Sequence, residues 1–116
     1  MGSIGYGLAH EAVKSEQYLQ RIKTSKLERH LILDNGADEL GEGMFGAEYL
    51  ELVWEIKPQE VIAPDVLGNA EKTIQRTTEF LDKNVEVLKE EGIDIMAVTQ
   101  GLQYNEFVNC YLKWLS

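Results

Sequence analysis

One pattern recurs three times in this sequence: a short apolar stretch runs into a polar residue beside glycine or proline, and an amphipathic segment follows. The three copies read LILDNG at 31–36, VIAPD at 61–65 and IMAVTQG at 95–101. This pattern predicts repeated units of a strand and a helix. Parallel strands need a crossover to return to the same edge of a sheet, so their carboxyl ends all point the same way. We therefore expect Asp34, Asp65 and Gln100 to share one rim, where α/β barrels and open α/β sheets bind ligands.

The apolar spacing also predicts the order of the elements. Residues 8–22 carry apolar side chains at roughly the 3.6-residue period of a helix, which precedes the first strand. Strands are expected at 31–33, 61–63 and 93–98, and the last is continuous enough in apolar residues to be covered on both faces. Helices are expected at 47–56, at 70–91 with Asn69 as its N-cap and Gly92 past its end, and at 106–115. The expected order is one helix followed by three strand and helix units.

Length and composition describe an ordinary globular chain. The 116 residues are expected to form a single domain, 1–116, in which residues 1–3 resemble a leader left by cloning. Hydrophobic residues make up 44% and charged residues 27%, as in soluble proteins. No apolar run approaches the ~20 residues of a membrane span, and no secretion signal is evident at the N-terminus. We expect a cytoplasmic protein that does not enter a membrane.

Charge and cysteine content exclude several kinds of partner and site. A net charge of −9 repels phosphate backbones, so the chain alone is expected to bind nucleic acid poorly. The basic stretch at 14–29 is interleaved with Glu16 and Glu28, which favours a solvated helix face. A single cysteine, Cys110, excludes an internal disulfide and a zinc site built from several thiolates. Cys110 is expected in the core.

The number of repeated units is too small for a closed barrel. A (β/α)₈ barrel takes eight strands, and this sequence has three clear units. An open parallel sheet would expose unpaired backbone groups at its two edges, which invites association. The fold is therefore expected to be α/β, a partial TIM barrel completed by further sequence or by pairing with another copy or a partner chain.

Two carboxylates and an amide at strand ends suit a planar heterocycle. Carboxylates accept hydrogen bonds from ring N–H and amino groups, whereas glutamine both donates and accepts. An alternative interpretation is structural: Asp34 caps its turn, Asp65 caps the following helix and Gln100 orders the next loop. The ligand interpretation is favoured because all three residues occupy the same place in successive units.

Other candidates are weaker. His10 and His30 have no carboxylate or cysteine at ligand spacing, so no metal site is expected. Trp54 and Trp114 fall at apolar helical positions and are expected in the core. No phosphate-binding loop with its lysine, and no pattern of a serine or cysteine nucleophile with histidine, is present in the sequence.

A glycine-rich stretch follows the first predicted strand. Gly41, Gly43 and Gly46 allow the backbone to come close to a ligand, although a flexible connector accounts for them equally well. Within it Glu39 and Glu42 are within reach of a ligand, and solvent exposure is the alternative.

The residues of these motifs resemble those of a known family. The segments LDNGA at 33–37, PDVLGN at 64–69 and VTQG at 98–101 resemble the queuine tRNA-ribosyltransferase superfamily. In that family an Asp-Ser-Gly-Gly motif, an aspartate after the next strand and a Val-Gln-Gly motif follow one another at similar spacing. The resemblance covers about residues 31–116 and is closest to the bacterial and phage branch that inserts 7-deazaguanines into DNA.

The resemblance implies a TIM barrel that exchanges guanine for a 7-deazaguanine base in tRNA or DNA through a covalent enzyme-sugar intermediate. By position, Asp34 matches the catalytic aspartate that handles protons as bases leave and enter. Asp65 and Gln100, with Gly101 beside it, match the residues that hold the base edge. General acid help to the departing base is consistent with this chemistry. Exchange on a duplex would also require the nucleotide to leave the base stack.

Departures from the family pattern limit what this chain is expected to do alone. Asn35 and Ala37 replace the family's serine and second glycine, Asp38 stands where an aromatic is usual, and Leu102 where glycine is common. The family's nucleophilic aspartate and its zinc site lie later in the fold, beyond Ser116. We therefore expect no cofactor in this chain and no complete reaction by it, with tRNA or DNA reached only through a complete assembly.

Two alternatives to a transglycosylase remain. One is a non-catalytic interaction module or partner subunit that keeps the same half-barrel and pairs through its open sheet edge. The other is a small α/β domain in which the motif matches are coincidental.

Overall fold

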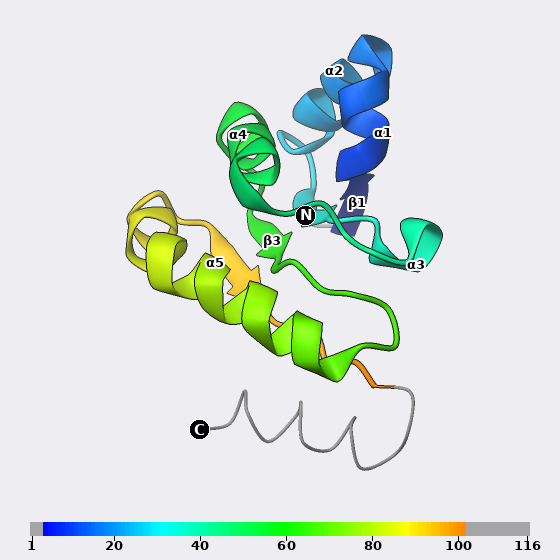
Figure 1. Ribbon diagram of the computed structural model, residues 1–116. Helices are drawn as coiled ribbons and strands as arrows, with labels where there is room; N and C mark the ends of the chain where they lie inside the picture. The colour runs from blue at the N-terminus through cyan, green and yellow to red at the C-terminus, as the bar shows by residue number, and fades with distance from the viewer. Residues whose placement is uncertain (1–3, 102–116) are drawn as a thin grey trace.

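The fold is a parallel four-stranded sheet with helices between its strands. The computed structural model describes residues 4–101 (Figure 1). The strands are hydrogen-bonded in chain order, β1-β2-β3-β4, and every neighbouring pair is parallel. The elements are β1 (Ile4–Leu8), α1 (Ala9–Lys14), α2 (Glu16–Ser25), β2 (His30–Asp34), α3 (Ala37–Leu40), α4 (Gly46–Ile56), β3 (Glu60–Ile62), α5 (Ala70–Glu90) and β4 (Asp94–Met96).

One face of the sheet carries the hydrophobic core. The strand register aligns Gly7 with Leu33, Leu33 with Val61, and Val61 with Ile95, so these residues form one row across the sheet. Leu33 and Val61 are fully buried in a cluster that also takes residues from α1, α2, α4 and α5. A side chain at Gly7 would meet Ile22 of α2, so glycine lets this helix lie close to β1. The main helices therefore all cover the same face.

This one-sided cover follows from the topology. Crossovers between parallel strands are almost always right-handed. When successive strands are added in chain order at the same edge, each crossover of that hand places its helix on the same side. In Figure 1, α1 and α2, then α4, then α5 follow one another around the sheet in chain order. The opposite face carries Tyr6, Ile32 and Glu60 in its own row, outside the core cluster.

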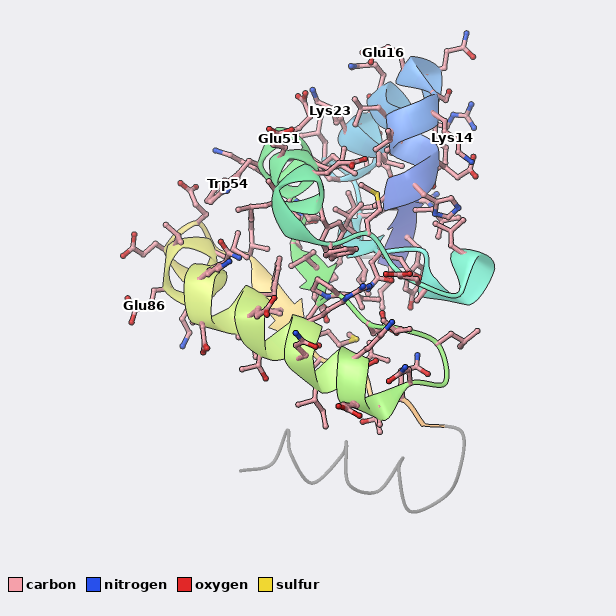
Figure 2. The ribbon with its side chains drawn as sticks, in the orientation of Figure 1. Lys14, Glu16, Lys23, Glu51, Trp54 and Glu86 are labelled. Atoms are coloured by element: carbon pink, nitrogen blue, oxygen red, sulfur yellow. The ribbon has the colours of Figure 1, made fainter. Side chains whose placement is uncertain are left out.

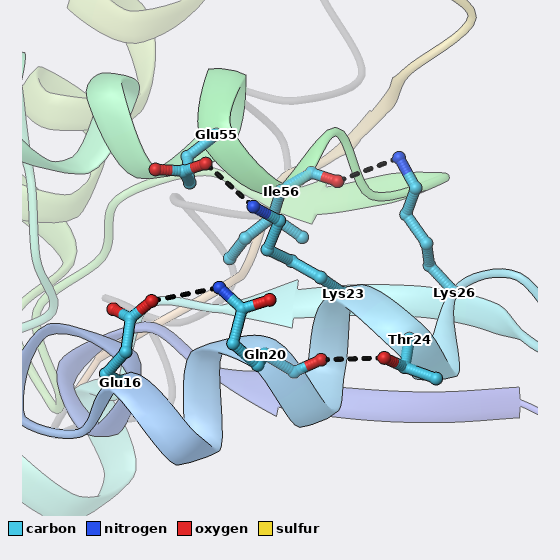
Figure 3. Close-up of polar contacts among 7 residues, drawn as sticks. All are labelled: Glu16, Gln20, Lys23, Thr24, Lys26, Glu55 and Ile56. Carbon is cyan, nitrogen blue, oxygen red and sulfur yellow. Dashed lines mark hydrogen bonds and ion pairs between the residues drawn. The ribbon is translucent and has the colours of Figure 1, made fainter.

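Helices α2 and α4 are joined by polar contacts at their exposed edge (Figure 3). Lys23 Nζ donates to Glu55 at 2.9 Å, and Lys26 Nζ donates to the backbone oxygen of Ile56 at 2.9 Å. The second contact places a positive charge at the carboxyl end of α4, where the helix dipole favours it. Because these groups are solvent-accessible, each contributes about 1 kcal/mol or less. Burial of the apolar faces therefore dominates the packing of the two helices.

Helix α5 is fastened to the loop that follows β3. Asn69 caps the helix by accepting from the Lys72 amide at 2.9 Å, as the sequence predicts. Two buried threonines of α5 reach back to this loop. Thr73 Oγ1 accepts from the Val66 amide at 2.9 Å, and Thr77 Oγ1 donates to the Pro64 carbonyl at 3.0 Å. The loop between these contacts, which carries Asp65, is held against the helix.

The beginning of the chain differs from the prediction. A strand, β1, precedes the first helix, and the expected helix at 8–22 is two helices that meet at Ser15. The predicted order of one helix followed by three strand and helix units is therefore wrong. Strand β1 has the sequence IGYGL. Its two glycines make the strand hard to predict from the sequence, because glycine weakens the alternating pattern of a strand. A Cβ at Gly7 would lie 3.2 Å from Ile22 of α2, and one at Gly5 would lie 3.3 Å from Ser25 at the end of α2, both tighter than an ordinary contact.

The end of the described chain also differs. Strand β4 covers Asp94–Met96, shorter than the predicted 93–98, and both of its end residues are exposed. Because Asp94 and Met96 share the face opposite Ile95 and are exposed, the expectation that both faces of this strand are covered is wrong for the described residues. Trp54 packs against the core while partly exposed. The predicted helix at 106–115, with Cys110 and Trp114, lies outside the described residues. Within 4–101, no helix combines the length and the apolar character needed to cross a bilayer.

Candidate functional site

Asp65 lies at the centre of a buried hydrogen-bonded group that joins the ends of three strands. Its side chain follows β3 and is only 3% exposed. Asn35, which follows β2, donates from Nδ2 to Asp65 Oδ1 at 2.5 Å. Gln100, which follows β4, donates from Nε2 to Asp65 Oδ2 at 2.8 Å. The predicted convergence of polar residues at one sheet edge is therefore present for Asp65 and Gln100.

Asn35 is a residue of this group that the sequence reasoning missed. It is fully buried, and besides Asp65 its Nδ2 donates to the Ala63 carbonyl at 2.9 Å. Its Oδ1 accepts from the Ala37 amide at 2.9 Å. The sequence alone presents Asn35 as a turn former and as a departure from a family motif. Its position directly after a buried strand was the signal, because side chains there face the same rim as Asp65.

Asp34 accepts a hydrogen bond within its own turn rather than contacting Asp65. Its Oδ1 accepts from the Gly36 amide at 3.0 Å, which closes the turn at the end of β2, and its side chain is half-buried. The alternative interpretation of Asp34 as the cap of its turn is thus confirmed. The contact from β2 to Asp65 is made by Asn35 rather than by Asp34. Asp34 nevertheless lies on the same sheet edge, one residue from that contact.

Gln100 uses its amide oxygen as well as its nitrogen. Its Oε1 accepts from the Gly68 amide at 3.0 Å, in the loop before α5. The carboxamide therefore bridges the carboxylate of Asp65 and the backbone three residues further along. Gln100 thus orders the loop before α5 rather than the loop that follows it, and its convergence with Asp65 is present. Gly101 follows directly and is partly buried.

The glycine-rich loop covers this group from the side of β2. The Gly43 amide donates to the Asp65 carbonyl at 3.0 Å, and the Leu67 amide donates to the Gly41 carbonyl at 2.8 Å. A Cβ at Gly43 would lie 2.5 Å from Asn35 Oδ1, so only glycine fits there. Gly43 therefore brings the backbone close to Asn35, and the approach of this loop to a ligand stays a prediction.

Of the two glutamates in this loop, Glu42 is half-exposed and forms an ion pair with Arg76 of α5. The Arg76 guanidinium stacks 3.8 Å from the centre of the Phe45 ring. The expectation of an exposed Glu42 is met, and its partner is a side chain of the protein. The side chain of Glu39 lies outside the described side chains.

Tyr49 lies beneath the sheet edge and is fully buried. Its hydroxyl donates to the Ile62 carbonyl at 2.6 Å. Burial raises the pKa of the Tyr49 hydroxyl well above its ordinary value of 10.0, and the charges of Asp34 and Asp65 raise it further. The unfolded chain therefore loses this proton near pH 10, whereas the folded chain keeps it.

This difference predicts an alkaline loss of stability that depends on Tyr49. The free energy of unfolding should be unaffected by Tyr49 below pH 10 and fall above it by up to about 1.4 kcal/mol per pH unit. The Tyr49→Phe variant should show a shallower fall between pH 10 and 11 in urea titrations. Tyr6→Phe, at an exposed position, is the matched control and should behave like the parent protein. Equal alkaline slopes for Tyr49→Phe and the parent would contradict the proposed cause.

His10 contacts the turn that carries Asp34. It is buried at the start of α1, and its Nε2 lies 3.3 Å from Glu11 Oε1. Its Nδ1 is buried and has no hydrogen-bond partner among the described residues. A Cβ at Gly36 would lie within 3.0 Å of this nitrogen, so the imidazole packs directly against the turn. Sequence reasoning treated His10 only as a poor metal ligand and gave no sign of this contact.

The carboxylate of Asp65 is compensated by amides rather than by a cation. Within residues 4–101 it forms no ion pair, and no group of three histidine, cysteine, aspartate or glutamate side chains could hold a metal ion. A cavity of about 250 Å³ lies between α4 and α5, lined in part by Phe45, Pro64 and Phe80. Asp34, Asp65 and Gln100 do not line it. Within this group the carboxylate of Asp65 is shielded from solvent, because the residue is only 3% exposed.

Comparison with known proteins adds no further assignment to this site. No protein-family model matches the chain, and no curated protein or solved structure is significantly similar to it. The function inferred for the site therefore depends on its own residues and geometry.

Proposed function

We propose that Asp65 and Gln100 form a recognition site for a planar base, in a chain that belongs to a transglycosylase-like assembly exchanging guanine for a 7-deazaguanine base in tRNA or DNA. The observation that carries this proposal is the buried carboxylate of Asp65 with the Gln100 amide donating to it at 2.8 Å. A buried carboxylate without a cation is costly unless its oxygens accept hydrogen bonds. The placement of such a costly group at a strand end favours a functional role.

The Gln100 amide stands where an N–H group of a base would bind. An ionised carboxylate accepts from adjacent N–H donors, and guanine and 7-deazaguanine present a ring N–H beside an exocyclic amino group. When such a base approaches, its N–H groups replace the Gln100 amide at Asp65 Oδ2. The released carboxamide can then donate to the carbonyl oxygen of the base. The site exchanges one set of hydrogen bonds for another, so binding leaves no buried acceptor unpaired.

Asp34 is proposed as the group that handles a proton as bases leave and enter. It lies at the same sheet edge, and it is half-buried with Oδ1 bound to the Gly36 amide. A carboxyl group next to a departing base supplies general acid help to the breaking glycosidic bond. Gly101, beside Gln100, is proposed to let the base edge come close to the backbone.

The sheet is proposed to be part of a (β/α)₈ barrel. Four parallel strands in chain order, with the main helices on one face, have the arrangement of consecutive units of such a barrel. Functional residues of these barrels lie at the carboxyl ends of the strands, as Asn35, Asp65 and Gln100 do here. The acidic chain is proposed to meet tRNA or DNA only in a complete assembly, with a second chain at its open sheet edge.

Calorimetric titration with guanine and with a 7-deazaguanine base tests the site. We expect both bases to bind the protein and the Asp65→Asn variant to bind at least about tenfold more weakly, because a hydrogen bond to a charged acceptor is worth about 1.5–3 kcal/mol. Asp94→Asn is the matched control. It removes an exposed carboxylate at the opposite end of the strands.

Circular dichroism should confirm that both variants are folded. Equal affinity of Asp65→Asn and Asp94→Asn for the base would contradict the proposal. Exchange of labelled guanine into tRNA or DNA by this chain alone is not expected.

A second candidate is the non-catalytic interaction module. The observation that favours it is that both oxygens of Asp65 are already occupied by amides of the protein, so the group can serve as a fixed junction between three strands. In that case neither guanine nor a 7-deazaguanine base binds the parent protein. Asp65→Asn then lowers only the stability of the fold. The titration above separates the two functions.

A further inference from the structure

The cavity between α4 and α5 combines an apolar lining with basic side chains. Its apolar lining comes from both helices and the segments before them: Phe45, Leu50, Pro64 and Phe80. Arg76 and Lys83 of α5 line it as well, together with one carboxylate, Glu79. Its volume of about 250 Å³ exceeds the roughly 150 Å³ of a cavity that takes up a benzene ring. A small molecule with an apolar body and a charged end matches this space.

Arg76 is a side chain of this cavity with incomplete hydrogen bonding. Its Nη2 pairs with Glu42, and its guanidinium carbon lies 3.8 Å from the centre of the Phe45 ring. Its Nη1 is buried and has no hydrogen-bond partner among the described residues. A buried donor of a charged group is costly to leave unpaired. A carboxylate would supply the missing acceptor, because its two oxygens match the planar fork of guanidinium donors.

Phe45 covers the Arg76 guanidinium without belonging to the core cluster. Its side chain is 51% exposed, so turning the ring away exposes little additional apolar surface. A ligand can therefore reach Nη1 of Arg76 once this ring turns. The apolar part of the ligand would then pack against Phe45 and Phe80, which line the same cavity.

The amino end of α4 adds positive potential to the cavity. Gly46 and Ala47 form the start of this helix and line the cavity. Phe45, at the N-cap, gives their amides no side-chain acceptor, and nothing lies within 4 Å of a Cβ built at Gly46. Amides in the first turn of a helix have no partner within the helix and carry partial positive charge. The helix end therefore acts together with Arg76 to favour an anion.

The charges around the cavity favour a singly charged anion over a dianion. Arg76 and Lys83 are balanced by Glu79 in the lining and by Glu42, the partner of Arg76. Within residues 4–101, Lys83 forms no ion pair. A phosphate dianion would be repelled by both glutamates and would leave the apolar lining unused. A carboxylate with an apolar body carries one charge and uses both parts of the cavity.

We infer that this cavity binds a small carboxylic acid with an apolar body of about the size of a benzene ring, and that Arg76 holds the carboxylate. The polar group around Asp65 does not line the cavity, so the two sites are separate. Loss of base binding with the acid still bound would refute the proposed function only. Loss of acid binding with the base still bound would refute this cavity site only.

NMR titration of the isotope-labelled chain tests the site with three probes: phenylacetate, its uncharged analogue phenylacetamide, and inorganic phosphate. Phenylacetate should bind with a Kd of about 1 mM or tighter and shift the amide signals of Gly46 and Ala47 most. Phenylacetamide lacks the charge and phosphate lacks the apolar body, so each should bind at least about fivefold more weakly. No binding of phenylacetate, or equal binding of either other probe, would overturn the inference.

Substitution of Arg76 tests which side chain holds the carboxylate. Arg76→Gln should weaken phenylacetate binding at least about tenfold, because hydrogen bonds between charged groups are the stronger ones. Arg21→Gln is the matched control, since it removes the same charge from an exposed position on α2. Helix α2, which carries Lys23, lies on the side of α4 away from α5 (Figure 2). Equal affinities of the two variants would contradict the role of Arg76.

Glu42→Gln keeps the test decisive if loss of Arg76 disturbs the fold. This variant removes the negative charge paired with Arg76 and leaves the guanidinium freer to bind the ligand. Phenylacetate should therefore bind about threefold more tightly than to the parent protein. A disturbed fold would weaken binding, so tighter binding cannot result from unfolding. Unchanged or weaker binding by Glu42→Gln would overturn the inference.

Discussion

Replacing Asn35 with leucine is expected to lower the free energy of unfolding by about 3 kcal/mol or more. Leucine has nearly the same volume, so the substitution opens no cavity, but it removes every hydrogen bond of a fully buried amide. Asp65 Oδ1, the Ala63 carbonyl and the Ala37 amide each lose a partner. An orphaned buried polar group costs about 1–3 kcal/mol, and more when it is charged. Urea denaturation of the parent and the variant measures the difference.

Asn84→Leu provides the matched control for this substitution. Asn84 is only partly buried, and its side chain donates to the Phe80 carbonyl of its own helix at 3.0 Å. We expect a change within about 0.5 kcal/mol there. In the Asn35→Leu, Asp65→Leu double variant the loss should be smaller than the sum of the two single losses, because the orphaned charge is gone. If Asn35→Leu cost no more than Asn84→Leu, the buried group would contribute little to stability.

The second large effect is expected at Gly36, where alanine should cost about 3 kcal/mol. Gly36 has φ of 84°, a left-handed conformation that costs a residue with a Cβ about 1–2 kcal/mol. A Cβ there would also lie within 3.0 Å of the His10 ring. Because His10 is buried, the ring cannot move without disturbing its neighbours, and such overpacking adds about 1–3 kcal/mol.

Gly41 separates the two causes. Its φ is 82°, but nothing lies within 4 Å of a Cβ built there. Gly41→Ala should therefore cost only the conformational part, about 1–2 kcal/mol, in the same urea titration. Combining Gly36→Ala with His10→Ala should recover part of the loss relative to the sum of the single variants. If Gly36→Ala and Gly41→Ala lowered the free energy of unfolding equally, the contact with His10 would contribute nothing to the effect at Gly36.

The sequence was most informative where local physics dominates. The apolar period of about 3.6 residues located α4 and α5, and Asn69 was identified as a cap because its side chain bonds within its own first turn. Strand β1 was missed because Gly5 and Gly7 carry no side-chain pattern. Their reason is tertiary: the neighbouring helix α2 needs the space. The five residues of β1 taken alone do not show that α2 needs this space.

The candidate site was predictable in place but not in its contacts. Parallel topology alone puts the polar residues after successive strands at one edge, and Asp65 and Gln100 meet there. Whether Asp34 or Asn35 turns toward Asp65 depends on which side chain closes the turn at Gly36. Asp34 does so, and the buried position is left to Asn35. That choice is made by packing across 30 residues of sequence, which spacing does not report.

The bond of Asp65 to amides from two other strands has a consequence for how this chain can diverge. Positions 35, 65 and 100 form a single chemical unit, so a replacement at one of them changes which residues are acceptable at the other two. Acceptable replacements at these positions would tend to arise as coordinated sets, while exposed positions drift independently. In an alignment of true descendants, the three columns should covary.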